Sequence, residues 1–120
     1  MADRVLFISW AAVVRGREER ALENFNETMG LYGRMQQDGR IESFDVALLN
    51  PSSGVDGYIE IHGSAEQLAT LKETEDFQRA LADASLIVED LKMVDGYTNA
   101  GIAKQMEIYT DAIAKVPQSA

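Results

Sequence analysis

The fold of this chain is decided by residues 41–62, which read IESFDVALLNPSSGVDGYIEIH. The apolar residues that alternate with polar ones on either side of the central turn are Phe44, Val46, Leu48, Ile59 and Ile61. A period of two is typical of a β-strand that buries one face. Residues 50–56 between the two runs are rich in Asn, Pro, Ser, Gly and Asp, which are turn-forming residues. We therefore predict a hairpin of two half-buried strands.

The segment before this hairpin predicts a strand and then a helix. Residues 4–14 are almost wholly apolar and rich in Val, Ile, Phe and Trp, as in a central strand that is buried on both faces. From residue 18 to about Gly39, apolar residues recur at spacings of three and four, which predicts an amphipathic helix. Gly30 and Gly33 inside it each cost about 1 kcal/mol relative to Ala, and we expect close packing against the sheet to explain them.

The segment after the hairpin predicts helices and one more strand. Ser64 and Gln67 have the spacing of a capping box, and Thr74 can begin a second short helix. Residues 87–94 are rich in Val, Ile and Leu and predict a fourth strand. From about residue 98 to 115, a last helix is expected to carry a narrow apolar stripe made of Ile102, Met106, Tyr109 and Ile113.

The order of these elements predicts the topology. Right-handed crossovers over each helix leave room for one strand between the strands they join, which gives an antiparallel sheet with strand order 4-1-3-2. The expected class is therefore α+β, with a ferredoxin-like βαββαβ arrangement and both crossover helices on one face. We expect a single domain over residues 1–120, with its core at about 4–96 and the C-terminal helix outside it.

The other face of the predicted sheet is left without a cover. The residues of the hairpin expected there are Ser43, Asp45, Ala47, Tyr58, Glu60 and His62. The first strand contributes either the residues that alternate with Trp10 or those that alternate with Phe7, and the pattern leaves both open. Because small domains seldom expose a large apolar area, we expect a homodimer in which two sheets pair across a two-fold axis.

The element order over residues 4–96 resembles that of the dimeric α+β barrel superfamily. Its members include cofactor-free monooxygenases of the antibiotic-biosynthesis type, chlorite-dismutase-like haem proteins, EthD-like proteins, YCII-related proteins and stress-responsive barrels. Residues 74–77, Thr-Glu-Asp-Phe, followed by Leu86 and Val88, are similar to the Asp-Pro-Phe segment of YCII-related proteins. The central Pro is missing and the first helix has no His, so the His and Asp chemistry of that family is not carried over.

Composition and charge exclude several classes of function. The chain has 11 basic and 20 acidic residues, a formal net charge of −9, which repels nucleic acid and anionic lipid. No apolar run approaches the length of a membrane span, and no leader pattern precedes the first strand, so we expect a cytoplasmic protein without membrane contact. With no Cys and one His, we predict no intrinsic metal and no cofactor.

The best acid–base pair in the sequence is Glu60 with His62, because residues two apart on a strand share a face. Asp45, Tyr58 and Trp10 are the ligand-binding candidates near it, with the two aromatic side chains as a pocket wall. The alternative for each is structural, since such residues are also common at sheet edges and in plain core.

A second candidate lies at the start of the first helix, where Arg15 and Arg17 flank Gly16. Free N–H groups at a helix N-terminus favour an anionic ligand. The alternative is that both arginines pair with nearby acids, such as Glu18 and Glu19.

Together these features predict a small dimeric barrel protein that binds a small hydrophobic or aromatic metabolite, or transforms it without a cofactor. The alternative from another class is a non-catalytic module for protein–protein interaction or assembly. An enclosed pocket distinguishes the two.

Overall fold

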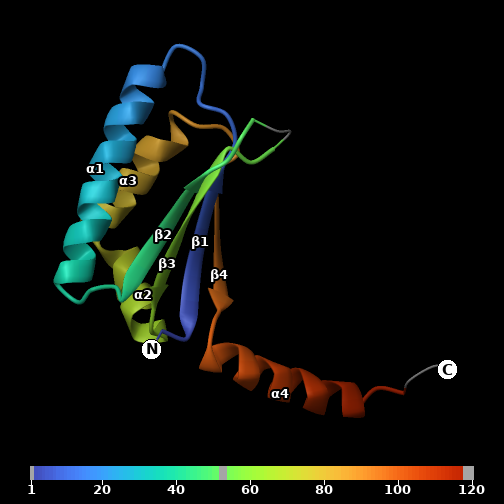
Figure 1. The fold of residues 1–120 in the computed structure, drawn as a ribbon. Helices are drawn as coiled ribbons and strands as arrows, with labels where there is room; N and C mark the ends of the chain where they lie inside the picture. The colour runs from blue at the N-terminus through green and yellow to red at the C-terminus, as the bar shows by residue number, and fades with distance from the viewer. Residues whose placement is uncertain (1, 52–53, 118–120) are drawn as a thin grey trace.

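The computed structural model describes residues 2–51 and 54–117 as a four-stranded antiparallel sheet with helices on one face (Figure 1). The elements in chain order are β1 Arg4–Trp10, α1 Glu18–Gln37, β2 Ser43–Leu48, β3 Gly57–Gly63, α2 Ala65–Glu73, α3 Glu75–Ser85, β4 Lys92–Tyr97 and α4 Ala100–Ala114. The strand order β2-β3-β1-β4 is the predicted order seen from the other edge. The α+β, ferredoxin-like fold class is confirmed.

The register of the strands settles which residues of β1 face the helices. Leu6 and Ile8 point to the helix side, where they are at most 3% exposed. Their partners Ile61 and Ile59 on β3 are equally buried, at 0% and 5%. Phe7 lies on the opposite face, where its ring meets that of Tyr58 at 5.3 Å between centroids. Trp10 therefore belongs to the helix side and Phe7 to the open face.

The predicted bounds of the first and fourth strands are wrong. β1 ends at Trp10 and not at Val14, and β4 spans Lys92–Tyr97 and not residues 87–94. Residues 11–14 and 87–89 instead bond to each other beyond the end of the sheet, for example from Val14 N–H to the Ile87 carbonyl at 2.9 Å. The apolar side chains of Val13, Ile87 and Val88 line a cavity on the helix side, so contact with this cavity, and not a central strand, accounts for these apolar positions.

The helices follow the sequence more closely. The capping box at the start of α2 is confirmed, because Ser64 Oγ accepts the Gln67 N–H at 3.0 Å while Gln67 Oε1 accepts the Ser64 N–H at 2.8 Å. Thr74 separates α2 from α3. The expected close packing at the two α1 glycines is wrong: an added Cβ meets nothing within 4 Å at Gly33, and only the Arg34 guanidinium at Gly30.

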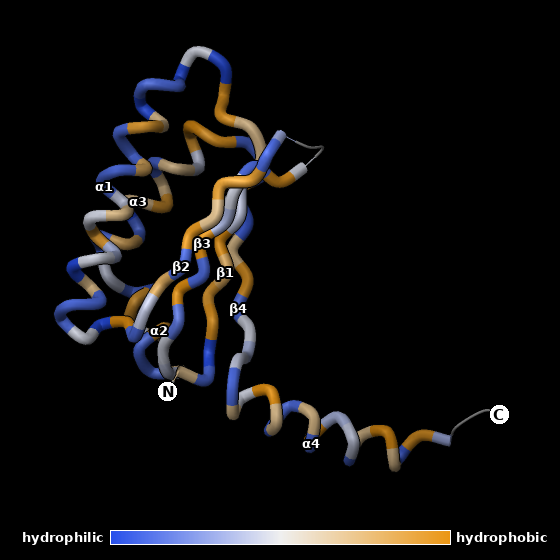
Figure 2. The backbone as a smooth tube through the Cα atoms, in the orientation of Figure 1, coloured by the Kyte–Doolittle hydropathy of each residue, from blue (hydrophilic) through white to orange (hydrophobic). Residues whose placement is uncertain are grey.

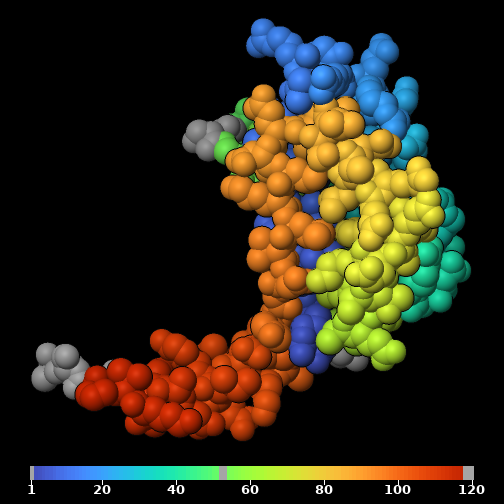
Figure 3. All heavy atoms as spheres, turned by 180° about the vertical axis from the view of Figure 1, so that it is seen from behind, coloured from blue at the N-terminus to red at the C-terminus, as the bar shows by residue number. Residues whose placement is uncertain are grey.

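The arrangement in space leaves two parts of the chain without a cover. Helices α1, α2 and α3 lie on one face of the sheet, and the opposite face is bare (Figures 1 and 2). Helix α4 stands off the body, as the view from behind also shows (Figure 3). Ser52 and Ser53 of the predicted turn lie outside the described residues, and the hairpin is closed by Leu49 N–H to the Asp56 carbonyl at 2.8 Å. None of the helices in the described ranges is long and apolar enough to cross a membrane.

Candidate functional site

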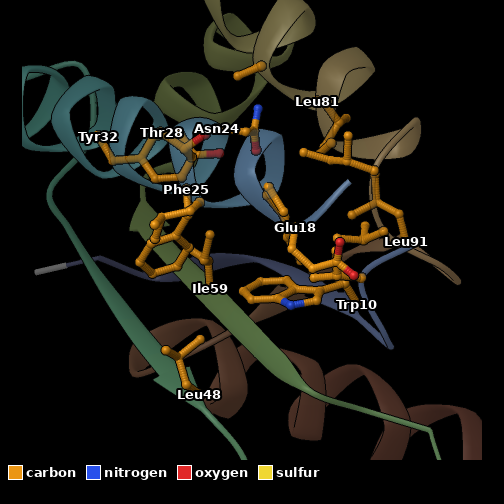
Figure 4. A pocket seen from close by; sticks show the side chains of 18 residues that line it. Trp10, Glu18, Asn24, Phe25, Thr28, Tyr32, Leu48, Ile59, Leu81 and Leu91 are labelled. Atoms are coloured by element: carbon orange, nitrogen blue, oxygen red, sulfur yellow. The ribbon is translucent and has the colours of Figure 1, made fainter. Parts of the chain in front are cut away.

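A cavity of about 320 Å³ lies between α1, α3 and the helix-side face of the sheet (Figure 4). Its wall is mostly aliphatic and aromatic, with Trp10 and Ile59 from the sheet and Phe25 from α1. Gly57, paired with Trp10 across β1 and β3, makes room for the indole, since an added Cβ would come within 2.5 Å of its Cζ2 atom. The residue after the turn thus shapes the sheet side of this cavity.

Three polar side chains on successive turns of α1 also line the cavity: Asn24, Thr28 and Tyr32. They are 7%, 8% and 2% exposed, so all three are more than nine-tenths buried. Their side chains have no hydrogen-bond partner among residues 2–51 and 54–117, yet no fully enclosed polar atom there is left unpaired. All three residues therefore contribute polar groups to a wall that is otherwise mainly apolar. Burial raises the pKa of Tyr32, so its phenol stays neutral and can donate a hydrogen bond.

Glu18 lies at the mouth of the cavity, close to Trp10 in Figure 4. Its carboxylate accepts the Gly16 N–H at 2.9 and 3.1 Å. Hydrogen bonds from its own N–H and from that of Gly16 lower the pKa of Glu18. The chain thus supplies its own anion at the α1 N-terminus.

The two arginines proposed for an anionic ligand are not brought together into a site. The Arg17 guanidinium donates to the Leu86 carbonyl and so ties the start of α1 to the end of α3. Arg15 is exposed, and within the described part of the chain it forms no ion pair. Within residues 2–51 and 54–117, neither arginine forms an ion pair with Glu18 or Glu19, so the structure does not show the alternative pairing with nearby acids either.

The predicted acid–base pair lies on the open face, with Asp45 beside it. His62 Nε2 is 3.3 Å from Glu60 Oε2 and 3.4 Å from Asp45 Oδ2. Asp45 and Glu60 are directly opposed across β2 and β3. The side chains of His62, Glu60 and Asp45 are 18%, 36% and 74% exposed, so this triad opens to solvent in one copy of the chain.

The triad also has the ligand types of a cation site. Within the described residues it is the group of His and carboxylate side chains whose ligand atoms lie within 4.8 Å of one another. Imidazole with two carboxylates suits a divalent transition metal. Sequence spacing does not indicate this cluster, because its members come from two strands and only the register brings them together.

The structure therefore divides the predicted site residues. Tyr58 lies on the open face with the triad, whereas Trp10 lies on the helix side. The sequence analysis missed the polar lining of the cavity. Its signal was present: Asn24, Thr28 and Tyr32 are four residues apart, which places them on one line of a helix.

Similar solved structures include a dimeric protein of unknown function with a ferredoxin-like fold from Bacteroides fragilis, with 14% identity, a TM-score of 0.60, and coverage of 79% of this chain and 96% of that one. A conserved protein of unknown function from Bacteroides thetaiotaomicron, a possible oxidoreductase, is 17% identical with a TM-score of 0.61. The match covers 82% of this chain and 100% of that one. A dimeric ferredoxin-like protein of unknown function from Thermobifida fusca is 10% identical with a TM-score of 0.55. The match covers 82% of this chain and 93% of that one. The chain shares their ferredoxin-like fold. No protein-family model and no curated protein matches it.

These likenesses confirm the expected resemblance to ferredoxin-like dimeric proteins at the level of fold. The shared architecture leaves the chemistry to be argued from the residues of this chain.

Proposed function

We propose that this protein binds a small, mainly apolar molecule in the cavity between α1, α3 and the sheet. The observation that carries the proposal is the line of buried polar side chains, Asn24, Thr28 and Tyr32, that borders an otherwise apolar cavity. Buried polar groups cost free energy unless they are paired. A bound molecule with an oxygen or nitrogen at one end pairs them, and its apolar body fills the rest.

The size and wall of the cavity narrow the class of molecule. A volume of about 320 Å³ is at the lower end of the range for small-molecule sites, which favours a ligand of one or two rings. Trp10 and Phe25 offer aromatic faces to a planar body. The only charged residue among the lining residues is Glu18, an anion, so we infer a neutral or cationic ligand.

The same residues favour binding over catalysis in this cavity. A general base works best when its pKa is near the working pH. Glu18 has a lowered pKa and Tyr32 a raised one, so the first accepts a proton poorly and the second gives one up poorly. The proposed role of this cavity is therefore a ligand site.

The test uses the fluorescence of Trp10, the only tryptophan in the chain, with menadione as a neutral two-ring probe that quenches indole. We expect saturable quenching by the wild-type protein. Ala80→Leu fills the cavity from α3 and should lower the affinity for menadione about tenfold or more, because it removes the space the rings need. Ala82→Leu adds the same side chain at an exposed position of α3 and should leave the affinity unchanged.

Two results would contradict the proposal. One is quenching that rises linearly with menadione and never saturates, as for a collisional quencher. The other is saturable quenching that is equal in the Ala80→Leu and Ala82→Leu variants, which would place the probe elsewhere. Thr28→Val tests the buried polar side chains of α1 separately, since it removes one hydroxyl at nearly constant volume. It should lower the affinity for menadione severalfold.

We further propose that two copies associate through their open faces, as the sequence predicted. The support is that this face carries exposed apolar residues, such as Val94 at 56%, beside the half-buried ring pair of Phe7 and Tyr58. Two of the similar structures are of dimeric proteins. Sedimentation equilibrium at micromolar concentration tests the association, and a persistent monomer would contradict it.

A second candidate function follows from the triad. If two open faces pair, His62, Glu60 and Asp45 become enclosed, and an imidazole flanked by two carboxylates is suited to proton transfer. His62→Gln keeps the volume and a hydrogen-bonding group but removes the base. Loss of substrate turnover in the His62→Gln variant, with association and folding intact, supports this role. An unchanged turnover rate in that variant refutes it.

A further inference from the structure

Helix α4 is a second part of the molecule, besides the open face of the sheet, whose apolar surface the chain itself does not cover. Ile102, Met106 and Tyr109 are 49%, 53% and 61% exposed and lie on one stripe of the helix. The opposite side of α4 carries the charged residues Lys104, Glu107 and Asp111, and Lys115 follows at its C-terminal end. In Figure 2 the apolar positions recur along α4 although the helix stands away from the body. It is thus an amphipathic helix with a bare apolar side.

The joint that holds α4 out is built by specific residues. Asn99 adopts a positive φ of 50°, and its Nδ2 donates to the Ala2 carbonyl at 2.6 Å. The Thr98 N–H donates to the Asp3 carbonyl at 3.1 Å. Gly101 is buried against the same carbonyl, where a Cβ would clash. These contacts fix the direction of the helix from its first turn onward.

The direction is toward the side of the sheet that the other helices leave bare. In Figure 1 α1 and α3 lie on one side of the sheet and α4 extends to the other, and Figure 3 shows the same relation from behind. Fifteen residues at about 1.5 Å each make α4 roughly 22 Å long. Two packed sheets are about 10 Å apart, so α4 extends beyond the sheet of any copy seated on the open face.

We propose that α4 is a dimerisation arm that packs its apolar stripe on a second copy of this chain. The inference rests on the open-face association proposed above and adds a second contact to it. A two-fold axis makes the contact reciprocal, because the α4 of each copy then packs on the other copy. The arm and the open face then belong to one continuous, self-complementary surface.

The area required for a stable dimer supports a second copy as the occupant. Stable interfaces bury about 800 Å² per partner. Four strands of six or seven residues present a face of roughly 400 Å² in outline, from strand spacing and rise. The arm adds roughly 200 Å² in outline, from its length and a diameter of about 10 Å. The arm adds about half of the outline area of the open face, so a dimer that uses both surfaces buries about half as much area again as one that uses the open face alone.

The experiment is sedimentation equilibrium on the full chain with two double variants of α4. Met106→Gln with Tyr109→Gln makes the stripe polar. Lys104→Gln with Asp111→Gln is the matched control, because it changes the opposite side of the same helix and leaves the net charge unchanged. We expect the stripe variant to raise the dimer Kd about 100-fold, as for the loss of two buried anchors, and the control to change it less than threefold.

A third variant, Val94→Gln on the open face, separates this inference from the open-face association, and circular dichroism checks that each variant keeps its helix content. If Val94→Gln weakens the dimer and the stripe variant does not, the association through the open face holds and the arm is refuted. If only the stripe variant weakens it, α4 is a dimer contact, but the open-face association is refuted, and with it the arrangement in which the arm adds to that association. A wild-type chain that stays monomeric at all concentrations refutes both, as does a dimer that neither variant weakens.

Discussion

The two faces of the sheet are made of alternate residues on the same strands, and they differ in what completes them. On the helix side, Leu6, Ile8, Ile59 and Ile61 are at most 5% exposed, and α1, α2 and α3 pack over them. On the open face, Val94 is 56% exposed and the Asp45 side chain 74%. The helix side closes within one chain and even retains a cavity with polar groups. The open face has its polar groups in position but lacks a cover.

The comparison separates two sources of stability and function. Burial on the helix side is intramolecular, so it determines whether a single chain folds. Burial on the open face depends on protein concentration if a second copy supplies it. Under the two proposals above, the helix-side cavity would bind its ligand in a monomer as well, whereas proton transfer at His62 would require the dimer. Substitutions on either face test this division.

The largest expected effect comes from two adjacent residues that face opposite ways. Ile61 is fully buried on the helix side, and Ile61→Ala should lower the free energy of unfolding by about 3 kcal/mol, through lost transfer free energy and a cavity. His62→Ala should lower it by less than about 1 kcal/mol, because that ring lies on the open face. Urea titration at one fixed protein concentration measures both.

Equal losses for Ile61→Ala and His62→Ala would break the comparison, since they would mean that the open face also belongs to the cooperative core. Repeating the titration at higher protein concentration sharpens it. A loss for His62→Ala that depends on concentration would locate the ring in an interface.

Two glycines give the next largest contrast. Gly57→Ala places a Cβ within 2.5 Å of the Trp10 ring and 3.0 Å of the Ala47 carbonyl oxygen, so the variant should lose about 1–3 kcal/mol by overpacking. Gly33→Ala, in the middle of α1 with nothing within 4 Å, should gain about 0.5–1 kcal/mol from helix propensity. Thermal unfolding measures both signs, and a shift in Trp10 emission is expected only for Gly57→Ala. A stable Gly57→Ala variant with unchanged emission would show that the ring does not need this space.

The sequence predicted the fold because the deciding signals are local. Alternation in residues 43–48 and 57–63, the capping box at Ser64 and the break at Thr74 depend only on near neighbours, and all four are present in the structure. The bounds of the first and fourth strands were wrong for a non-local reason. Val13, Ile87, Val88 and Leu91 line the cavity, and an apolar run in the sequence does not distinguish that role from a central strand.

The candidate site was less predictable because it depends on register and on empty space. Spacing placed Glu60 and His62 on one face, and Asp45 was among the candidates, but the direct opposition of Asp45 and Glu60 is set by how β2 pairs with β3. Trp10 was assigned no face, because β1 is apolar on both. A cavity leaves no mark in a sequence other than polar residues on a buried helix line, such as Asn24 and Thr28.

A smaller effect tests the electrostatics of the open face. Asp45 and Glu60 are like charges directly opposed across two strands, which is destabilising. Asp45→Asn should therefore raise the free energy of unfolding by about 0.5 kcal/mol at neutral pH. Glu42→Gln, an exposed neighbour before β2, is the control and should have no effect. If Asp45→Asn instead destabilises the protein, the carboxylate interacts with a cation, either protonated His62 or a bound metal.

An effect of about the same size, with the opposite sign, is expected at an exposed carboxylate on the helix layer that stabilises the fold. Desolvation raises the pKa of Asp76, but hydrogen bonds from the Thr74 hydroxyl, the Arg40 guanidinium and the Phe77 N–H outweigh it and lower the pKa below its usual value. A lowered pKa contributes stability that is present above the unfolded value, about 3.9, and is lost as the pH falls through the folded value. Asp76→Asn should therefore cost about 0.5 kcal/mol at neutral pH and nothing in strong acid, whereas Glu73→Gln should change stability at neither pH. Unfolding titrations of wild type and both variants across acid pH measure this, and a loss for Asp76→Asn that persists in acid would mean that the side chain acts through packing and not through its charge.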